Sequence, residues 1–396
     1  MTMKNFLRIF AENETDMKNP FVTNGYAGTE FFCDRVEETD DLRTLLTNEH
    51  NVALVSPRRL GKTELINHVF DCEEFRDSYY CFIIDIYATK SLGDFVNVLG
   101  KAVLDALKPK GKKAWEKFIA AVNSIRTEIS FDINGQPSWS VGLGELRNPA
   151  ATLDEIFSYL QSADRPCIVA IDEFQQITKY ADTNVEATLR TYVQKTTNAH
   201  FIFSGSHRHL MNGIFTSPSR PFYQGVTVMN LKPIPLEKYI EFAEEKFRGR
   251  GRTVDPEVVS SLYAKFDAVT SYIHRVLSIL FSMTEEGTVC STKMIGGAID
   301  FIVRLSSDSY ESLLYQMPAK QRDVFLAIAS ENNAKEVSGS AFVRKYGLIS
   351  PSSVSSAVRG LLEKDFITND AGVYSVYDKF FLLWLGSKGL LANGRA

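Results

Sequence analysis

The sequence has no long hydrophobic run. None of its apolar stretches approaches the roughly 18 consecutive residues that a membrane-spanning helix needs. Charged side chains interrupt the apolar residues from Met1 to Pro20, so this segment lacks the core of a secretory signal peptide. We therefore expect a cytoplasmic protein without a membrane partner.

Cysteine and histidine are also scarce. The five cysteines are scattered, and no two of them have the C-x-x-C spacing of a redox or zinc motif. This pattern favours reduced, buried thiols in a reducing compartment. His207 and His209 have no third ligand beside them in the sequence, which argues against a metal site there.

The chain has no large surplus of positive charge. A formal net charge of -4 gives the whole protein no attraction to nucleic acid or to acidic membranes. Any contact with DNA would have to use a local patch.

Short β-rich runs alternate with helical patterns through the first half of the chain. This alternation is typical of an α/β fold with a parallel sheet and crossover helices. The runs are almost continuously apolar, which suits strands that are covered on both faces. They are Asn51–Val55, Tyr79–Tyr87, Pro166–Ile171, His200–Ser204 and Gly225–Leu231.

At 396 residues the chain is long enough for two or three domains, and we predict three. The first spans residues 1–232 and contains an insertion at about 101–150. Within it, Lys101–Ile125 is predicted to be helical and Glu128–Gly142 to form a hairpin around Asn134-Gly135. Proline residues within 232–235 then end the sheet. Helical spacing from Leu236 to Thr284 predicts a helical lid domain at 233–309.

The third predicted domain, residues 310–396, has the pattern of a winged helix-turn-helix. Three short helical segments precede two strands around Asp370-Ala371-Gly372, within Phe366–Phe380. The helical segments are Lys320–Ser330, Gly339–Tyr346 and Ser352–Asp365.

A phosphate-binding loop follows the first strand. Ser56-x-x-x-x-Gly61-Lys62-Thr63 lies between an apolar strand and a helical stretch, which is the context that this motif requires. Lys62 is expected to reach the β- and γ-phosphates, and the Thr63 hydroxyl to ligate Mg²⁺. Serine replaces the first glycine, and it fits if its φ angle is negative. The predicted nucleotide contacts here are Ser56, Pro57, Arg58, Arg59, Leu60, Gly61, Lys62, Thr63 and Glu64.

Two carboxylates end the third apolar run. Asp172 is expected to hold Mg²⁺, and Glu173 to polarise the attacking water as a general base. The fourth run ends in small polar residues, so Ser204 or Ser206 is placed to sense the γ-phosphate. A plain strand-ending turn is the alternative for these serines.

With these segments, the chain resembles the archaeal-type ATPase family, P-loop proteins related to the AAA+ and STAND ATPases. The resemblance rests on Pro57–Thr63 and Ile171–Phe174, supported by Phe32–Glu38, Phe203–Ser206, Arg220–Tyr223 and Tyr374–Trp384. It implies a P-loop ATPase core with a helical lid and a winged helix, and ATP with Mg²⁺ as ligands.

The resemblance also implies further site residues. It places the segment containing Asp34 and Arg35 near the adenine. Many members carry an arginine where this chain has Gln224-Gly225, so Arg220 is the nearest substitute for that catalytic charge. Loss of such an arginine lowers turnover by roughly 10³–10⁵ in comparable enzymes.

Three functions remain open from the sequence. The first is an ATP-hydrolysing switch, and the second is a slow or non-hydrolysing module whose binding depends on ATP or ADP. The third is a DNA-binding regulator, for which Ser352, Ser353, Ser355, Ser356 and Arg359 are candidate contacts. Residues 310–396 contain ten Lys/Arg and eight Asp/Glu, so DNA affinity has little electrostatic support. A protein partner is the alternative ligand of the winged helix.

Overall fold

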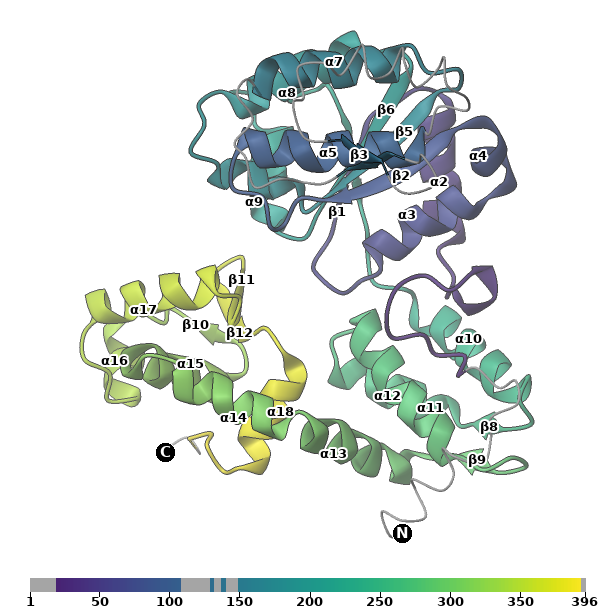
Figure 1. Ribbon diagram of the computed structural model, residues 1–396. Coiled ribbons are helices and arrows are strands. Elements are labelled where there is room, and N and C mark those ends of the chain that lie inside the picture. The colour runs from purple at the N-terminus through teal and green to yellow at the C-terminus, as the bar shows by residue number, and fades with distance from the viewer. Residues whose placement is uncertain (1–18, 108–128, 132–136, 140–148, 393–396) are drawn as a thin grey trace. The chain divides into compact units, whose positions relative to one another are not determined.

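The computed structural model describes residues 19–107, 129–131, 137–139 and 149–392. They form two compact units, both drawn in Figure 1. The core unit comprises Val22–Phe242 and Val269–Ser271. The helical unit comprises residues 19–21, 243–268 and 272–392. The predicted domain limits at residues 232 and 309 stay predictions.

A five-stranded parallel sheet forms the centre of the core unit, in the order β2-β5-β6-β1-β7. Each predicted apolar run contributes one strand, so the predicted α/β class with a parallel sheet is confirmed. The strands are β1 (Val52–Val55), β2 (Tyr80–Asp85), β5 (Cys167–Asp172), β6 (Ala199–Gly205) and β7 (Thr227–Asn230).

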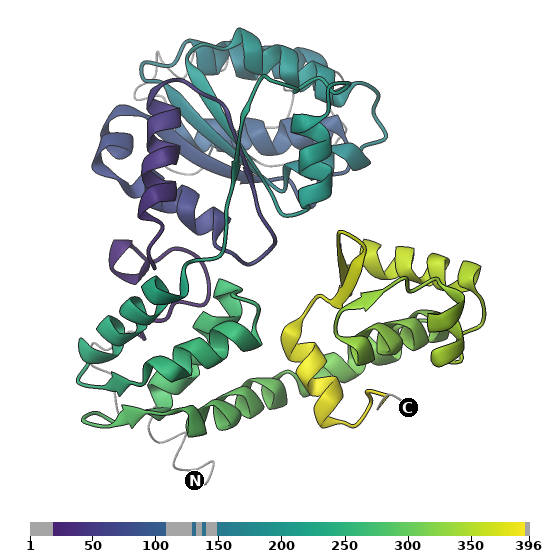
Figure 2. The ribbon, with the colours of Figure 1, turned by 180° about the vertical axis from the view of Figure 1, so that it is seen from behind.

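Successive side chains of each strand point into two separate cores. Ala53 and Val55 of β1 pack in one core, whereas Val52 and Leu54 pack in the other. This follows from the two-residue period of a strand. Helices α5 (Leu92–Ala106), α7 (Pro149–Gln161), α8 (Val185–Lys195) and α9 (Arg208–Thr216) cover the first face (Figure 1 and Figure 2). Helices α2 (Val36–Thr47), α3 (Lys62–Asp71) and α4 (Glu73–Ser78) cover the second. Coverage on both faces explains why the strands are apolar throughout.

Helix α3 is the helix predicted after the phosphate loop. The core unit also contains two short 3-10 helices, η1 (Thr29–Phe31) and η2 (Phe174–Lys179). Strands β3 (Ile129–Phe131) and β4 (Pro137–Trp139) pair antiparallel, as predicted for the hairpin. Its Asn134-Gly135 turn and most of the helix predicted at Lys101–Ile125 lie outside the described residues.

Helix α10 (Leu236–Arg248) begins in the core unit and continues into the helical unit after Phe242. The segment predicted as helical from Leu236 to Thr284 contains three helices and one short strand. The elements that follow α10 are β8 (Thr253–Val254), α11 (Pro256–Lys265), α12 (Thr270–Met283), β9 (Val289–Cys290), η3 (Thr292–Met294), α13 (Ile295–Leu305) and α14 (Ser307–Gln316).

The end of the described chain has the predicted winged-helix elements. They are α15 (Ala319–Glu331), α16 (Ser340–Lys345), α17 (Pro351–Glu363), β11 (Ile367–Asp370) and β12 (Val373–Val376). The sequence did not predict β10 (Ala334–Lys335), which pairs with β12. The second strand was predicted to reach Phe380, but it ends at Val376. Asp378 accepts hydrogen bonds from the backbone N–H groups of Phe380 and Phe381, and so caps α18 (Lys379–Ser387).

No helix in the described part of the chain has both the length and the apolar character to span a membrane. The five cysteines all lie in that part and form no disulfide.

Candidate functional site

The phosphate loop, residues 56–63, connects buried strand β1 to α3. Gly61 has a φ of 92° directly before the helix, a conformation that glycine adopts without steric cost. Ser56 is not among the residues with positive φ, so serine fits this turn as expected. The first N–H groups of α3 have no partner within the helix, and the positive end of its dipole faces the loop. This arrangement suits phosphate.

Lys62 is buried at the start of α3, with only 7% of its surface exposed. Its ammonium donates a long hydrogen bond of 3.4 Å to the Ser56 hydroxyl. Burial lowers the pKa of Lys62, while the nearby charges of Asp172 and Glu173 act in the opposite direction. A buried ammonium that faces two carboxylates is a suitable partner for an anionic phosphate.

Thr63 and Asp172 meet across the site. The Thr63 hydroxyl donates to Asp172 Oδ2 at 2.7 Å, which links α3 to the carboxyl end of β5. Hydroxyl and carboxylate oxygens are hard ligands, and Mg²⁺ needs only one or two of them when phosphates complete its shell. The pair therefore fits the predicted metal role. No group of three or more His, Cys, Asp or Glu side chains suited to a metal occurs among the described residues.

Strand order places the end of β6 between the loop and the acidic pair. β6 lies between β5 and β1, with Gly205 opposite Val55. The Ser206 hydroxyl, just beyond the strand, lies 3.0 and 2.9 Å from the two carboxylate oxygens of Glu173. The Ser204 hydroxyl is fully buried and makes no hydrogen bond within the described structure. Of the two serines at this strand end, only Ser206 contacts the acid.

Glu173 has a left-handed backbone, with a φ of 56°. Its N–H donates to Asp172 Oδ1 at 3.0 Å, and its carboxylate also accepts a hydrogen bond from the Gln175 amide. Gly205 allows this packing: an added Cβ would lie 2.3 Å from Gln175 Oε1. The acidic pair is thus held by neighbours on both sides.

Arg35 supports the phosphate loop through hydrogen bonds to backbone carbonyl groups. It is 2% exposed and donates to the carbonyl oxygens of Leu60, at 3.0 Å, and Lys232, at 2.6 Å. It also pairs with Glu38 at 2.6 Å. Arg35 and its neighbour Asp34 both have positive φ angles. The structure gives Arg35 a bracing contact with the phosphate loop, and the adenine role of both residues stays a prediction.

Arg220, the predicted substitute for a catalytic arginine, forms an ion pair with Glu186 of α8. Burial raises the pKa of Glu186, and Arg220 opposes that shift. The charge of Arg220 is therefore already matched by a carboxylate in this structure.

The sequence reasoning missed Asp85 at the end of β2. It is aligned with Asp172 in the sheet, and its carboxylate accepts from the N–H of Tyr87 at 2.8 Å. Burial raises the pKa of Asp85, and the charges of Asp172 and Glu173 add to the effect. An acid at the carboxyl end of a predicted parallel strand was the available signal.

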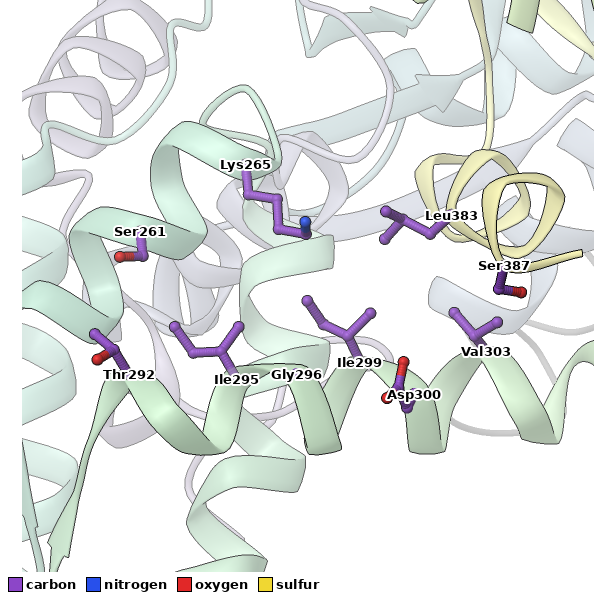
Figure 3. Close-up of a pocket in the computed structure, with 10 residues that line it drawn as sticks. All are labelled: Ser261, Lys265, Thr292, Ile295, Gly296, Ile299, Asp300, Val303, Leu383 and Ser387. Carbon is purple, nitrogen blue, oxygen red and sulfur yellow. The ribbon is translucent and has the colours of Figure 1, made fainter. Parts of the chain in front are cut away.

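A separate cavity of about 480 Å³ lies within the helical unit, between α11, α13 and α18 (Figure 3). Ile299 and Leu383 contribute aliphatic surface, and Lys265 and Asp300 one charge of each sign. A triphosphate needs several donors, so this cavity is a poorer match for ATP than the phosphate loop is.

A family model described as an ATPase domain predominantly from Archaea matches residues 32–290. The chain belongs to this ATPase family. A second model, a probable winged helix domain, matches residues 308–387. The predicted resemblance is thereby confirmed, and membership of the ATPase family supports nucleotide binding. Among curated proteins, none matches the chain.

Solved structures show the same fold at low sequence identity. A Walker-type ATPase of Pyrococcus abyssi is 17% identical with a TM-score of 0.59, over 93% of this chain and 99% of its own. The Aeropyrum pernix ORC2 protein, in ADPNP-ADP complexes, is 11% identical with a TM-score of 0.55, over 94% and 97%. The Aeropyrum pernix ORC1 protein, in complex with DNA, is 14% identical with a TM-score of 0.52, over 91% and 94%.

Proposed function

We propose that this ATPase-family protein binds Mg²⁺-ATP at the phosphate loop, hydrolyses it slowly, and acts as a nucleotide-driven switch. The observation that carries the proposal is the 2.7 Å hydrogen bond between Thr63 and Asp172. It brings the metal-binding hydroxyl of the loop to the strand-end carboxylate, beside Lys62 and Glu173. Four side chain types that ATP hydrolysis uses are therefore in one place.

Each residue has a distinct proposed role. Lys62 holds the β- and γ-phosphates, while Thr63 and Asp172 hold Mg²⁺, Asp172 through water. The metal neutralises charge that develops on the phosphate oxygens. Glu173 orients the attacking water and takes its proton.

The proposed slow turnover rests on where the arginines lie. The chain has Gln224-Gly225 where many family members carry an arginine, and Arg220 is paired with Glu186. Without a charge at the transferred phosphate, turnover falls by roughly 10³–10⁵. We infer that a partner or a second copy of the chain supplies this charge when fast hydrolysis is needed.

A backbone hydrogen bond between the phosphate loop and α12 supports the switch role. The N–H of Ser271, in the first turn of α12, donates to the Arg59 carbonyl at 3.2 Å. The rest of α12 belongs to the helical unit. A change in the loop on nucleotide binding can therefore act directly on a helix that continues into that unit.

Calorimetry and phosphate release test the proposal together. Wild-type protein should bind a slowly hydrolysed ATP analogue with Mg²⁺, and Lys62→Ala should abolish that binding. Glu173→Gln should bind ATP normally and release phosphate at least about 100-fold more slowly, the scale of general-base catalysis. Equal phosphate release by wild type and Glu173→Gln would remove the catalytic assignment and leave a non-hydrolysing nucleotide-dependent module.

DNA binding is a second candidate function. It is favoured by the exposed positions of Ser352, Ser355, Ser356 and Arg359 on α17. The structurally similar ORC1 protein was solved in complex with DNA. Against it, β11 ends in Asp370 at the wing, and residues 310–396 have a surplus of only two positive charges.

A salt series decides this second function. Specific or nonspecific DNA binding should appear at about 50 mM salt and weaken steeply as salt rises. Arg359→Ala should weaken it further. If no duplex binds even at low salt, the winged helix has another role, for which a protein partner is the remaining candidate.

A further inference from the structure

Arg58, within the phosphate loop, is hydrogen-bonded to the end of β6. Its Nε donates to the Ser206 hydroxyl at 3.0 Å, and its Nη2 lies 3.2 Å from His207 Nε2. Ser206 in turn contacts both carboxylate oxygens of Glu173, at 3.0 and 2.9 Å. Three side chains therefore form a continuous chain from the loop to the proposed general base.

The direction of these hydrogen bonds is fixed by the groups themselves. A guanidinium can only donate, and an ionised carboxylate can only accept. The Ser206 hydroxyl must therefore accept from Arg58 and give its single proton to Glu173. Ser206 is 8% exposed, so water does not readily replace either partner.

Two side chains orient the Glu173 carboxylate. Ser206 and the Gln175 amide both donate to its carboxylate. A carboxylate has about four acceptor positions, so these two bonds fix its orientation and still leave a position for the attacking water. A change in the hydrogen bonding of Ser206 therefore changes the orientation of Glu173.

Arg58 is close to the place where phosphate is expected. After burial, which is the largest influence, the positive charge of Arg58 also helps to lower the pKa of Lys62. The same guanidinium that orients Ser206 thus acts on the phosphate-binding lysine. Arginine stays charged and binds phosphate oxygens through paired N–H groups. Phosphate can therefore compete with Ser206 for this side chain.

We propose that Arg58 exchanges Ser206 for phosphate when ATP binds, and that this exchange changes the hydrogen bonding of Glu173 through Ser206. The inference rests on the proposed ATPase function and adds its regulation. Arg58 is then a positioning residue that acts on Glu173 through Ser206. Ser206 competes with the nucleotide for Arg58. The apparent affinity for ATP is therefore lower than it would be if Arg58 were always available to bind phosphate.

Calorimetric titration with a slowly hydrolysed ATP analogue and with ADP tests the exchange without measuring activity. Ser206→Ala removes the competitor, so the analogue should bind roughly tenfold more tightly, the scale of one hydrogen bond to a charged group. Affinity for ADP should change less than about threefold, because ADP lacks the additional phosphate that the exchange uses. Ser206→Thr keeps the hydroxyl and should restore the wild-type affinities.

Arg58→Ala completes the test. It should weaken analogue binding roughly tenfold and ADP binding much less. In the Arg58→Ala background, Ser206→Ala should have no further effect, because the two residues act as one unit. Arg165→Ala is the matched control: Arg165 donates to the Asp77 carbonyl at 2.9 Å, near the amino end of β5, and its loss should leave both affinities unchanged.

Three results separate the possible explanations. Weaker analogue binding by Ser206→Ala would mean that Ser206 itself contacts phosphate, which overturns the exchange. Equal loss of ATP-analogue and ADP affinity in Arg58→Ala would mean that Arg58 only tethers the loop, which also overturns it. If wild-type protein binds neither nucleotide, the proposed function itself fails. Thermal unfolding of each nucleotide-free variant verifies that it is folded.

Discussion

The backbone N–H of Ser271 donates a hydrogen bond of 3.2 Å to the carbonyl oxygen of Arg59. Arg59 lies in the phosphate loop with a φ of 67°, and Ser271 is the second residue of α12. The N–H groups in the first turn of a helix have no partner within the helix. The loop therefore uses a donor that α12 can offer without losing any of its own hydrogen bonds.

Ser271→Pro should disconnect the loop from α12. Proline is tolerated in the first helical turn and removes only this N–H. We expect the affinity for an ATP analogue to stay within about threefold of wild type, while the difference between ATP- and ADP-bound scattering profiles disappears. Small-angle scattering measures this difference. Ser271→Ala keeps the N–H and should retain it; a full nucleotide response in Ser271→Pro would show that the bond does not transmit the signal.

Thr63→Ala should remove the increase in ATP-analogue affinity that Mg²⁺ gives. The variant lacks the hydroxyl that pairs with Asp172 and that is proposed to ligate the metal. In wild type, Mg²⁺ should tighten ATP-analogue binding at least about tenfold, whereas Thr63→Ala should bind equally with Mg²⁺ and with EDTA. Thr63→Ser keeps the hydroxyl and serves as the control. A full Mg²⁺ effect in Thr63→Ala would exclude Thr63 as a ligand.

Arg35→Ala should strongly destabilise the core unit. The buried guanidinium satisfies the Leu60 and Lys232 carbonyls and pairs with Glu38. Because Glu38 is partly exposed, the cost comes mainly from leaving the buried carbonyls without a donor, about 1–3 kcal/mol for each. Arg43→Ala breaks an exposed pair with Glu74 and should cost less than about 1 kcal/mol. Urea denaturation of both variants measures the contrast, and equal midpoints would mean that Arg35 does not brace the loop.

The sequence predicted the elements that have a strong local pattern. Strands β1, β5 and β6 are buried and the edge strands β2 and β7 are mostly half-buried, so each appears as a largely apolar run. Helix α3 begins where Gly61 ends the phosphate loop. The acidic pair could be placed because β5 ends at Asp172. The short strand β10 could not, since two residues carry no periodicity and its pairing with β12 depends on distant parts of the chain.

Contacts within the site were harder to predict than the residues that make it. The bonds from Ser206 to Glu173 and from Arg58 to Ser206 exist because β6 lies between β5 and β1. Strand order is a property of the folded sheet and leaves no mark in the local sequence. The same is true of Asp85, whose alignment with Asp172 is set by strand pairing.

Gly205→Ala should disturb Glu173 without changing a residue that is proposed to bind the nucleotide. An added Cβ would lie 2.3 Å from Gln175 Oε1 and 2.4 Å from Met211 Sδ, so both side chains must move. We expect a loss of about 1–3 kcal/mol in the free energy of unfolding, as in other overpacked cores. Turnover should fall because Gln175 donates to Glu173.

A matched control for this substitution lies in α9. Gly213 is within the helix and has no atom within 4 Å of an added Cβ. Gly213→Ala should therefore stabilise the protein by roughly 0.5–1 kcal/mol through the lower flexibility of the unfolded chain. Thermal and urea unfolding of the two variants should shift in opposite directions. If the stability of both variants shifted in the same direction, crowding by an added Cβ would not be the reason that glycine occupies position 205.

Lys62→Met should abolish nucleotide binding and yet leave the nucleotide-free protein as stable as wild type or more stable. Burial lowers the pKa of Lys62 below its ordinary value of 10.5, so the folded state binds fewer protons than the unfolded chain between those two values. Stability should therefore rise with pH through that window. Methionine has a similar length and no charge to desolvate, which removes both the cost and the pH dependence. Urea denaturation at neutral and alkaline pH measures this, and a large loss of stability in Lys62→Met would show that the ammonium holds the loop together even without phosphate.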